Sequence, residues 1–298
     1  MKIFSALLLL SVLGLTAQAK LNVVATTPDF GSIAREIGGD KIDLTTIGKP
    51  TEDPHFVDAK PSYISKLNRA DAVIEGGAEL EIGWLPALLD QSRNPKLEAG
   101  KPGRILCNEG IPLMQVPTTL DRSKGDIHAA GNPHYTTDPA NAKIIAERIT
   151  TSFCELDAKS SDFYKANLKT FQQHLEEQIA GWQKMLAPYK GHRVVAYHDS
   201  WPYFARRFEI PMDLFLEPKP GIPPIASHLA EVISIMKKEK IHVIVVQPYQ
   251  SRRTAETVAS HADGVVVDFP SMPNEKQTYT EWMDGLVKSL VKAFGEKK

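Results

Sequence analysis

A long helical stretch in the middle of the chain constrains the fold more than any other feature. From Asp138 to about Tyr189 the apolar residues follow helical spacing almost without a break, and Pro188 ends the pattern. Within it, the part from about Ser160 to Leu186 carries a single apolar stripe with polar faces on either side. We therefore expect a stiff helix that connects two separate parts of the chain.

On both sides of this stretch, strand patterns alternate with helix patterns. The first side has strand patterns at residues 21–26, 42–47 and 72–75, with helix patterns at 31–37 and 61–69. The second side has strand patterns at residues 193–197, 241–246 and 264–268, with helix patterns at 225–238, 252–261 and 279–294. Such alternation favours parallel sheets built from βαβ units.

The predicted fold class is therefore α/β, with two lobes that each hold a mainly parallel sheet flanked by helices. One long rigid helix joins the lobes. The expected division is an export signal, a first lobe, a linking helix and a second lobe, at residues 1–19, 20–158, 159–188 and 189–298.

The first residues have the features of a signal peptide. Lys2 supplies a positive start, residues 3–15 form an apolar run too short to span a bilayer, and Ala17-Gln18-Ala19 is a small-residue cleavage site. We expect the mature protein to begin near Lys20 and to lie in the periplasm. No cysteine stands at the cleavage site, so the sequence gives no support for a lipid anchor there.

The charge and cysteine content of the chain limit the classes of partner that the sequence supports. The 35 basic and 36 acidic residues nearly cancel, so charge offers no argument for binding nucleic acid or an anionic membrane. Two cysteines, Cys107 and Cys154, are present. An oxidising compartment would allow a disulfide between them, and the sequence leaves that bond open. Their spacing matches no zinc-thiolate pattern.

Three histidines and one aspartate lie in turns or at strand ends, where ligands are often placed. His55 follows Asp53-Pro54, and His134 follows Asn132-Pro133. His198 ends the strand pattern at 193–197, and Asp268 ends the one at 264–268. The carboxyl ends of parallel strands face the ligand crevice of an open sheet. Converging, these four side chains would fill the coordination sphere of a divalent metal and leave no open position, which favours capture over catalysis.

Each of these residues has an ordinary structural interpretation as well. An exposed turn histidine or a helix-capping aspartate is common, and His128 in the loop before His134 is a weaker candidate for recruiting metal. The chain lacks a His-Glu-x-x-His motif, a Gly-x-Ser-x-Gly elbow and a phosphate-binding loop. A secreted zinc enzyme and an adhesin stabilised by a structural metal stay as alternatives to a metal-capturing protein.

Several motifs, in order along the whole mature chain, resemble those of the solute-binding proteins of zinc and manganese ABC importers. They are Val23-Val24-Ala25-Thr26-Thr27-Pro28, Asp53-Pro54-His55 with Pro61-Ser62, Gly131-Asn132-Pro133-His134 with Asp138-Pro139, and Tyr197-His198-Asp199 with Tyr203-Phe204. The Asn-Pro-His segment with its following Asp-Pro is the most specific of them.

The resemblance implies two α/β lobes bridged by a long helix, with metal held between the lobes. It places the ligands on His55, His134, His198 and Asp268, although Phe269-Pro270 departs from what many members carry after the last of these. It implies no enzyme activity, a monomer, and the membrane permease of an ABC importer as partner, with a metallochaperone as a further one. Three imidazoles and a carboxylate favour Zn²⁺ as the transported ligand, with Mn²⁺ or iron as the alternative cargo.

Overall fold

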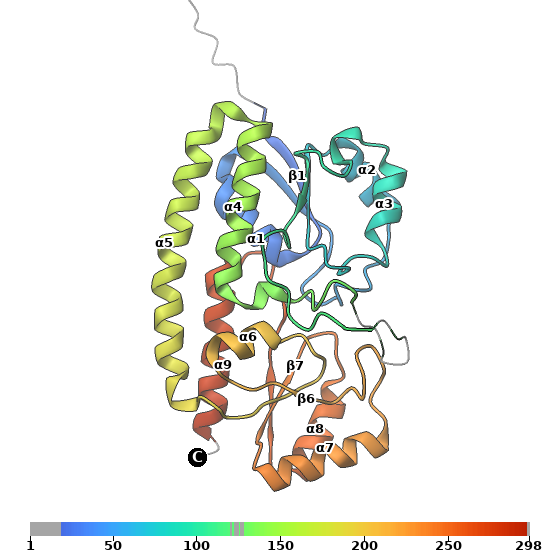
Figure 1. Ribbon diagram of the computed structural model, residues 1–298, viewed down its shortest axis with the longest axis vertical. Coiled ribbons are helices and arrows are strands. Elements are labelled where there is room, and N and C mark those ends of the chain that lie inside the picture. Colours follow the sequence, from blue (N-terminus) through green and yellow to red (C-terminus); the bar gives the residue numbers. More distant parts are fainter. Residues whose placement is uncertain (1–18, 120, 122–124, 126–127, 297–298) are drawn as a thin grey trace, which may run out of the picture.

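The computed structural model describes residues 19–119, 121, 125 and 128–296. The export signal expected at residues 1–19 therefore lies outside the described residues, apart from its last position. The described chain forms two α/β lobes stacked along the long axis of the molecule (Figure 1), so the predicted fold class is confirmed. Within the described ranges, none of the helices has both the length and the apolar character needed to cross a bilayer.

The first lobe contains a four-stranded parallel sheet in the order β2-β1-β3-β4. Its strands are β1 (Leu21–Ala25), β2 (Ile42–Thr46), β3 (Ala72–Glu75) and β4 (Arg104–Leu106), and its helices are α1 (Pro28–Gly38), α2 (Pro61–Arg69) and α3 (Leu85–Ser92). All three helices have proline in the first turn, where the missing N–H costs no helical hydrogen bond.

The second lobe repeats this plan with the order β6-β5-β7-β8, again all parallel. Its strands are β5 (Val195–Ala196), β6 (Leu214–Phe215), β7 (Val243–Val246) and β8 (Val265–Asp268), and its helices are α6 (Pro202–Phe208), α7 (Ala226–Glu239) and α8 (Arg252–His261). Strand β8 lies at one edge of the sheet and is separated from β5 by β7, whereas β6 pairs directly with β5.

One long helix joins the lobes, as the sequence predicted, and it forms the second arm of a helical hairpin. Helix α4 (Pro139–Leu156) ends at Asp157, whose φ of −137° and ψ of 75° leave the helical region. After a short 3₁₀ turn, the 26-residue α5 (Ser161–Leu186) runs back alongside α4 and on past the second lobe (Figure 1). The closing helix α9 (Tyr279–Glu296) packs against α5 and contacts both α1 and β8. Helix α9 therefore bridges the lobes alongside α5. The domain boundaries given above stay a prediction.

A continuous hydrophobic cluster extends from the first lobe through these helices into the second. It includes the fully buried rings of Phe30, Tyr135, Trp201 and Trp282. Since burying a large apolar side chain contributes about 1.5–3 kcal/mol, separating the lobes would expose too much apolar surface to occur readily. Cys107 and Cys154 are both free thiols, so the disulfide that the sequence left open is not formed.

Candidate metal centre

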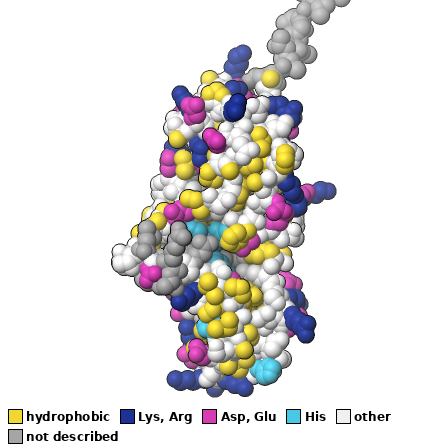
Figure 2. Space-filling view, turned by 90° about the vertical axis from the view of Figure 1, so that its right-hand side faces the viewer, with side chains coloured by type: hydrophobic (Ala, Val, Ile, Leu, Met, Phe, Trp, Pro, Cys, Tyr) yellow, Lys and Arg dark blue, Asp and Glu magenta, His cyan; other side chains and the backbone are white. Residues whose placement is uncertain are grey.

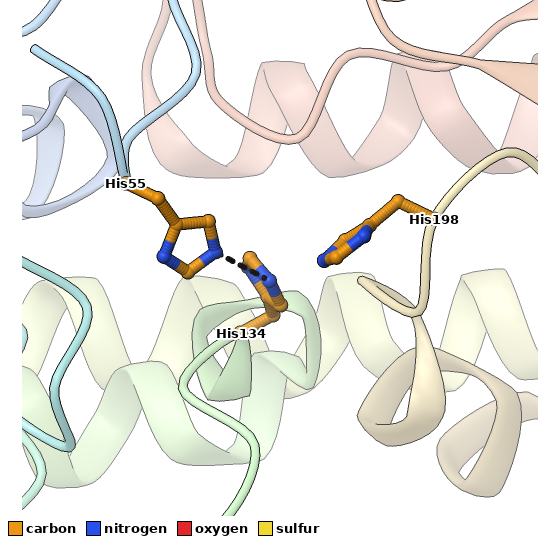
Figure 3. Close-up of side chains that lie close together, drawn as sticks. All are labelled: His55, His134 and His198. Atoms are coloured by element: carbon orange, nitrogen blue, oxygen red, sulfur yellow. Dashed lines mark hydrogen bonds between the residues drawn. The ribbon is translucent and has the colours of Figure 1, made fainter. Parts of the chain in front are cut away.

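The three predicted histidines come together where the two lobes meet. Each of His55, His134 and His198 offers one ring nitrogen, and these three atoms lie within 4.8 Å of one another. Figure 3 shows the rings facing a common point, with 3.3 Å between Nε2 of His55 and Nε2 of His134. The ring centroids are 5.1 Å apart for His55 and His134, 5.7 Å for His134 and His198, and 6.1 Å for His55 and His198.

Two of these histidines occupy the same kind of turn. The backbone N–H of His55 donates to Oδ1 of Asp53 at 3.0 Å, and that of His134 donates to Oδ1 of Asn132 at 3.0 Å. In each case an Asp or Asn side chain caps the residue two positions later while a proline fixes the backbone between them. The Asx-Pro-His pattern in the sequence thus sets the local direction of both imidazoles.

The His55 turn is held in place by the loop that follows β3. The indole Nε1–H of Trp84 donates to the carbonyl of Pro54 at 2.9 Å, and the Leu80 backbone accepts a hydrogen bond from the His55 ring. A ring that donates to a carbonyl on one side has its tautomer fixed and presents the other nitrogen as a lone pair. For His55, the presented atom is the Nε2 that faces His134.

The loop itself depends on a buried carboxylate. Gly77, Ala78 and Glu79 all have positive φ values, of 62°, 50° and 67°. Glu81 stabilises this left-handed turn by accepting from the N–H groups of Gly76 and Gly77 at 2.7 and 3.2 Å, and it also accepts from the hydroxyl of Thr26 at 2.7 Å. Burial raises the pKa of Glu81 to about 7 against the opposing effect of these donors.

The His134 turn is fastened to the second lobe. The side-chain amide of Asn132 donates to the carbonyl of Asp199 at 2.8 Å, and the hydroxyl of Tyr203 donates to the carbonyl of Asn132 at 2.7 Å. The same hydroxyl accepts from the N–H of Met114 at 2.8 Å. One turn therefore carries a candidate ligand of the first lobe and two of the hydrogen bonds that join it to the second.

His198 stands at the carboxyl end of β5, as the sequence predicted, and its ring contacts a carboxylate that the sequence analysis missed. Nδ1 of His198 lies 2.7 Å from Oε2 of Glu217, which follows β6. Because β6 and β5 are neighbours in the sheet, their carboxyl ends bring these two side chains together. The only sequence signal was an acidic residue after the short apolar run Leu214–Leu216.

Burial and mutual repulsion determine the protonation of the cluster. Burial, followed by the neighbouring His128 and His198, lowers the pKa of His55 to about 3, and burial, with His55 next, keeps the pKa of His134 well below its usual range. For His198 burial acts in the same direction, but the hydrogen bond and charge of Glu217 outweigh it and raise the pKa. His55 and His134 are therefore neutral at neutral pH, which is the state that binds metal.

Asp268 does not join the cluster in this structure. Its side chain is 78% exposed and pairs with Arg252, and it lies outside the group of candidate ligands found among the described residues. The reason is strand order: Asp268 ends β8, two strands from the β5 end that carries His198. Among the described residues, the closed four-ligand site expected from the sequence is thus a three-histidine site with room for a fourth donor.

Two small cavities flank the histidines and are lined by His128 and His198 in common. One has a volume of about 170 Å³ and also contacts His134, whereas the other, about 180 Å³, contacts His55 and includes the oxygen donors Asp53 and Glu217. The His128 ring stacks on that of His55 with 5.0 Å between centroids. In Figure 2, histidine side chains (cyan) gather at the level where the two lobes meet. A cation at this point would be within reach of solvent.

Comparisons with known proteins agree with this architecture. A profile of the family described as zinc-uptake complex component A, periplasmic (ZnuA), matches residues 23–293. The metal ABC transporter substrate-binding lipoprotein ScbA of Streptococcus cristatus is 25% identical over 280 residues, covering 86% of this chain and 84% of that protein. The manganese ABC transporter substrate-binding lipoprotein PsaA of Streptococcus anginosus is 24% identical over 249 residues, covering 82% and 77%.

Solved structures show the same fold. A crystal structure of ZnuA superimposes with a TM-score of 0.79 at 23% identity, covering 93% of this chain and 99% of that one. The solute-binding protein FpvC from Pseudomonas aeruginosa, in complex with Mn²⁺, superimposes with a TM-score of 0.78 at 19% identity, covering 94% and 100%.

Two parallel α/β lobes joined by long helices, with a histidine cluster between them, define a solute-binding protein of the ABC-transporter type and not an enzyme. Within that class, the chain belongs to the family of the periplasmic zinc-uptake component A.

Proposed function

We propose that this protein captures Zn²⁺ in the periplasm and delivers it to the membrane permease of an ABC importer. His55, His134 and His198 would hold the ion, and solvent would occupy the fourth position. The observation that carries the proposal is the convergence of three ring nitrogens within 4.8 Å, with two of the rings kept neutral by burial. Neutral imidazoles at about 2.0–2.1 Å from the ion are the ligands that Zn²⁺ accepts in tetrahedral sites.

The choice of zinc over manganese rests on the donor set. Mn²⁺ favours oxygen ligands and a higher coordination number, and it binds most nitrogen-containing sites more weakly than Zn²⁺ does. The relatives are named for zinc, for manganese and for metal in general, so their names support a transition metal without selecting one. Iron and manganese thus remain the alternative cargo, and the monomeric state and a metallochaperone partner stay predictions.

Competition titration against a chromophoric chelator tests this proposal directly. We expect the wild-type protein to bind Zn²⁺ at least about 100-fold more tightly than Mn²⁺, and His134→Ala to lose most of that affinity. His174→Ala is the matched control, because it removes an exposed histidine of α5 far from the cluster. Tighter binding of Mn²⁺ than of Zn²⁺ would overturn the choice of metal, and unchanged affinity in His134→Ala would overturn the site.

A further inference from the structure

The geometry points to Glu217 as the residue that positions His198 for metal capture and links the occupied site to the turn at Lys219–Ile222. This inference rests on the proposed function, and it assigns a role to a side chain that the sequence pattern does not single out. In this inference Glu217 contacts the metal ligand His198 and does not itself coordinate the metal.

The backbone around Glu217 is fixed relative to His198. The pairing of β6 with β5 continues past the strands, because the N–H of Leu216 donates to the carbonyl of Ala196 at 3.0 Å and the N–H of Glu217 donates to the carbonyl of Tyr197 at 3.1 Å. The Glu217 side chain is only 14% exposed. Its carboxylate therefore has little freedom to leave the His198 ring.

The hydrogen bond to Glu217 determines which ring nitrogen of His198 is available to the metal. A carboxylate 2.7 Å from Nδ1 accepts the proton of that nitrogen, so the neutral ring carries its lone pair on Nε2. In Figure 3 the His198 ring extends from its own lobe toward His134 and His55. Without the carboxylate, the ring would sample both tautomers and other rotamers, and the free energy of ordering it would be subtracted from metal binding.

The same carboxylate oxygen also holds the next turn. The N–H of Gly221 donates to Oε2 of Glu217 at 3.1 Å. Gly221 has a φ of +73°, and the turn is closed by the N–H of Ile222 donating to the carbonyl of Lys219 at 3.0 Å. A cation on Nε2 of His198 makes the proton on Nδ1 more acidic and strengthens its bond to Glu217. Metal occupancy is thereby transmitted through one side chain to the turn that precedes the exposed Ile225.

Affinity and spectroscopy together test the positioning role. The variants are Glu217→Ala, Glu217→Gln and, as a control, Glu209→Gln, which removes the same charge from an exposed position of the same lobe. For Zn²⁺ in chelator competition, we expect about a 10–100-fold loss in Glu217→Ala, a smaller loss in Glu217→Gln because its amide oxygen still accepts the proton of Nδ1, and no loss in the control. The absorption spectrum of bound Co²⁺ should keep its shape in every variant, because Glu217 is not a ligand.

Three outcomes would overturn the inference. Wild-type affinity in Glu217→Ala would show that His198 needs no positioning, and a changed Co²⁺ spectrum in Glu217→Gln would show that Glu217 coordinates the ion. Hydrogen exchange of the backbone amides of Gly221 and Ile222, which both donate within this turn, should slow on zinc binding in the wild type but not in Glu217→Ala. Equal exchange of these amides with and without zinc in the wild type would refute the link to the turn. A wild-type protein that bound neither Zn²⁺ nor Co²⁺ would instead refute the proposed function.

Discussion

Each buried histidine should make a contribution to the stability of the metal-free protein that is lost in mild acid, and His55 allows the size of this contribution to be worked out. Its pKa is about 3 in the folded protein, against about 6.5 in the unfolded chain. Because the unfolded state takes up the proton first, stability is lost as the pH falls from 6.5 toward 3. Between pH 7 and pH 5 the loss from this one residue is about 2 kcal/mol.

A second buried group opposes this loss. Glu81 has a folded pKa of about 7, well above its unfolded value of about 4.3–4.5, so the folded state takes up this proton first and gains stability as the pH falls. Between pH 7 and pH 5 the gain is again about 2 kcal/mol. The two effects nearly cancel in the wild type, and only variants separate them.

Urea unfolding at pH 7 and pH 5, with EDTA present throughout, measures the difference. Relative to the wild type, His55→Asn should lose about 2 kcal/mol less between the two pH values, and Glu81→Gln should lose about 2 kcal/mol more. Each variant is compared with itself at the two pH values, so the pH-independent effect of the substitution on the free energy of unfolding cancels. The same pH dependence in all three proteins would refute the reasoning.

Three further expectations concern stability. Arg207→Ala should cost about 3 kcal/mol in urea unfolding, because it removes the bidentate partner of the fully buried Asp138. Arg206 also contacts Asp138 but is more exposed, so Arg206→Ala should cost less than about 1 kcal/mol, and equal costs for the two variants would contradict this reasoning. Lys240→Gly should add about 0.5–1 kcal/mol, because Lys240 ends α7 with a φ of 56°, and destabilisation would refute it. Free Zn²⁺ at 100 times its Kd should add about 2.7 kcal/mol at pH 7 to the wild type but not to His134→Ala.

Much of the fold was predictable because its signals are local. The continuous apolar run of β7 and the amphipathic pattern of α8 each determine their element from a few adjacent residues. The Asx-Pro-His turns are equally local, since the side chain that caps each turn lies two positions before the histidine it directs. His55 and His134 were therefore recognisable as candidates from the sequence.

The part of the site that could not be predicted depends on contacts between segments that lie far apart in the sequence. Strands β5 and β6 are two residues long, too short to give a periodic pattern, and their pairing decides which carboxylate meets His198. Asp268 and Glu217 both stand at the carboxyl ends of apolar strands, and no local property distinguishes them. Strand order alone puts Glu217 next to β5 and its His198, because β6 pairs with β5, and leaves Asp268 two strands away from β5.

The contacts between the lobes also limit how metal binding can be signalled. The hydroxyl of Tyr279 donates to the carbonyl of Thr136 at 2.6 Å, Arg207 pairs with Asp138, and the hydrophobic cluster is continuous across the junction. A wide rotation of one lobe would break all of these at once, and loss of the buried ion pair alone would cost about 3 kcal/mol. Changes on metal binding should therefore be confined to side chains and turns at the cleft, which is where Glu217 connects His198 to Gly221.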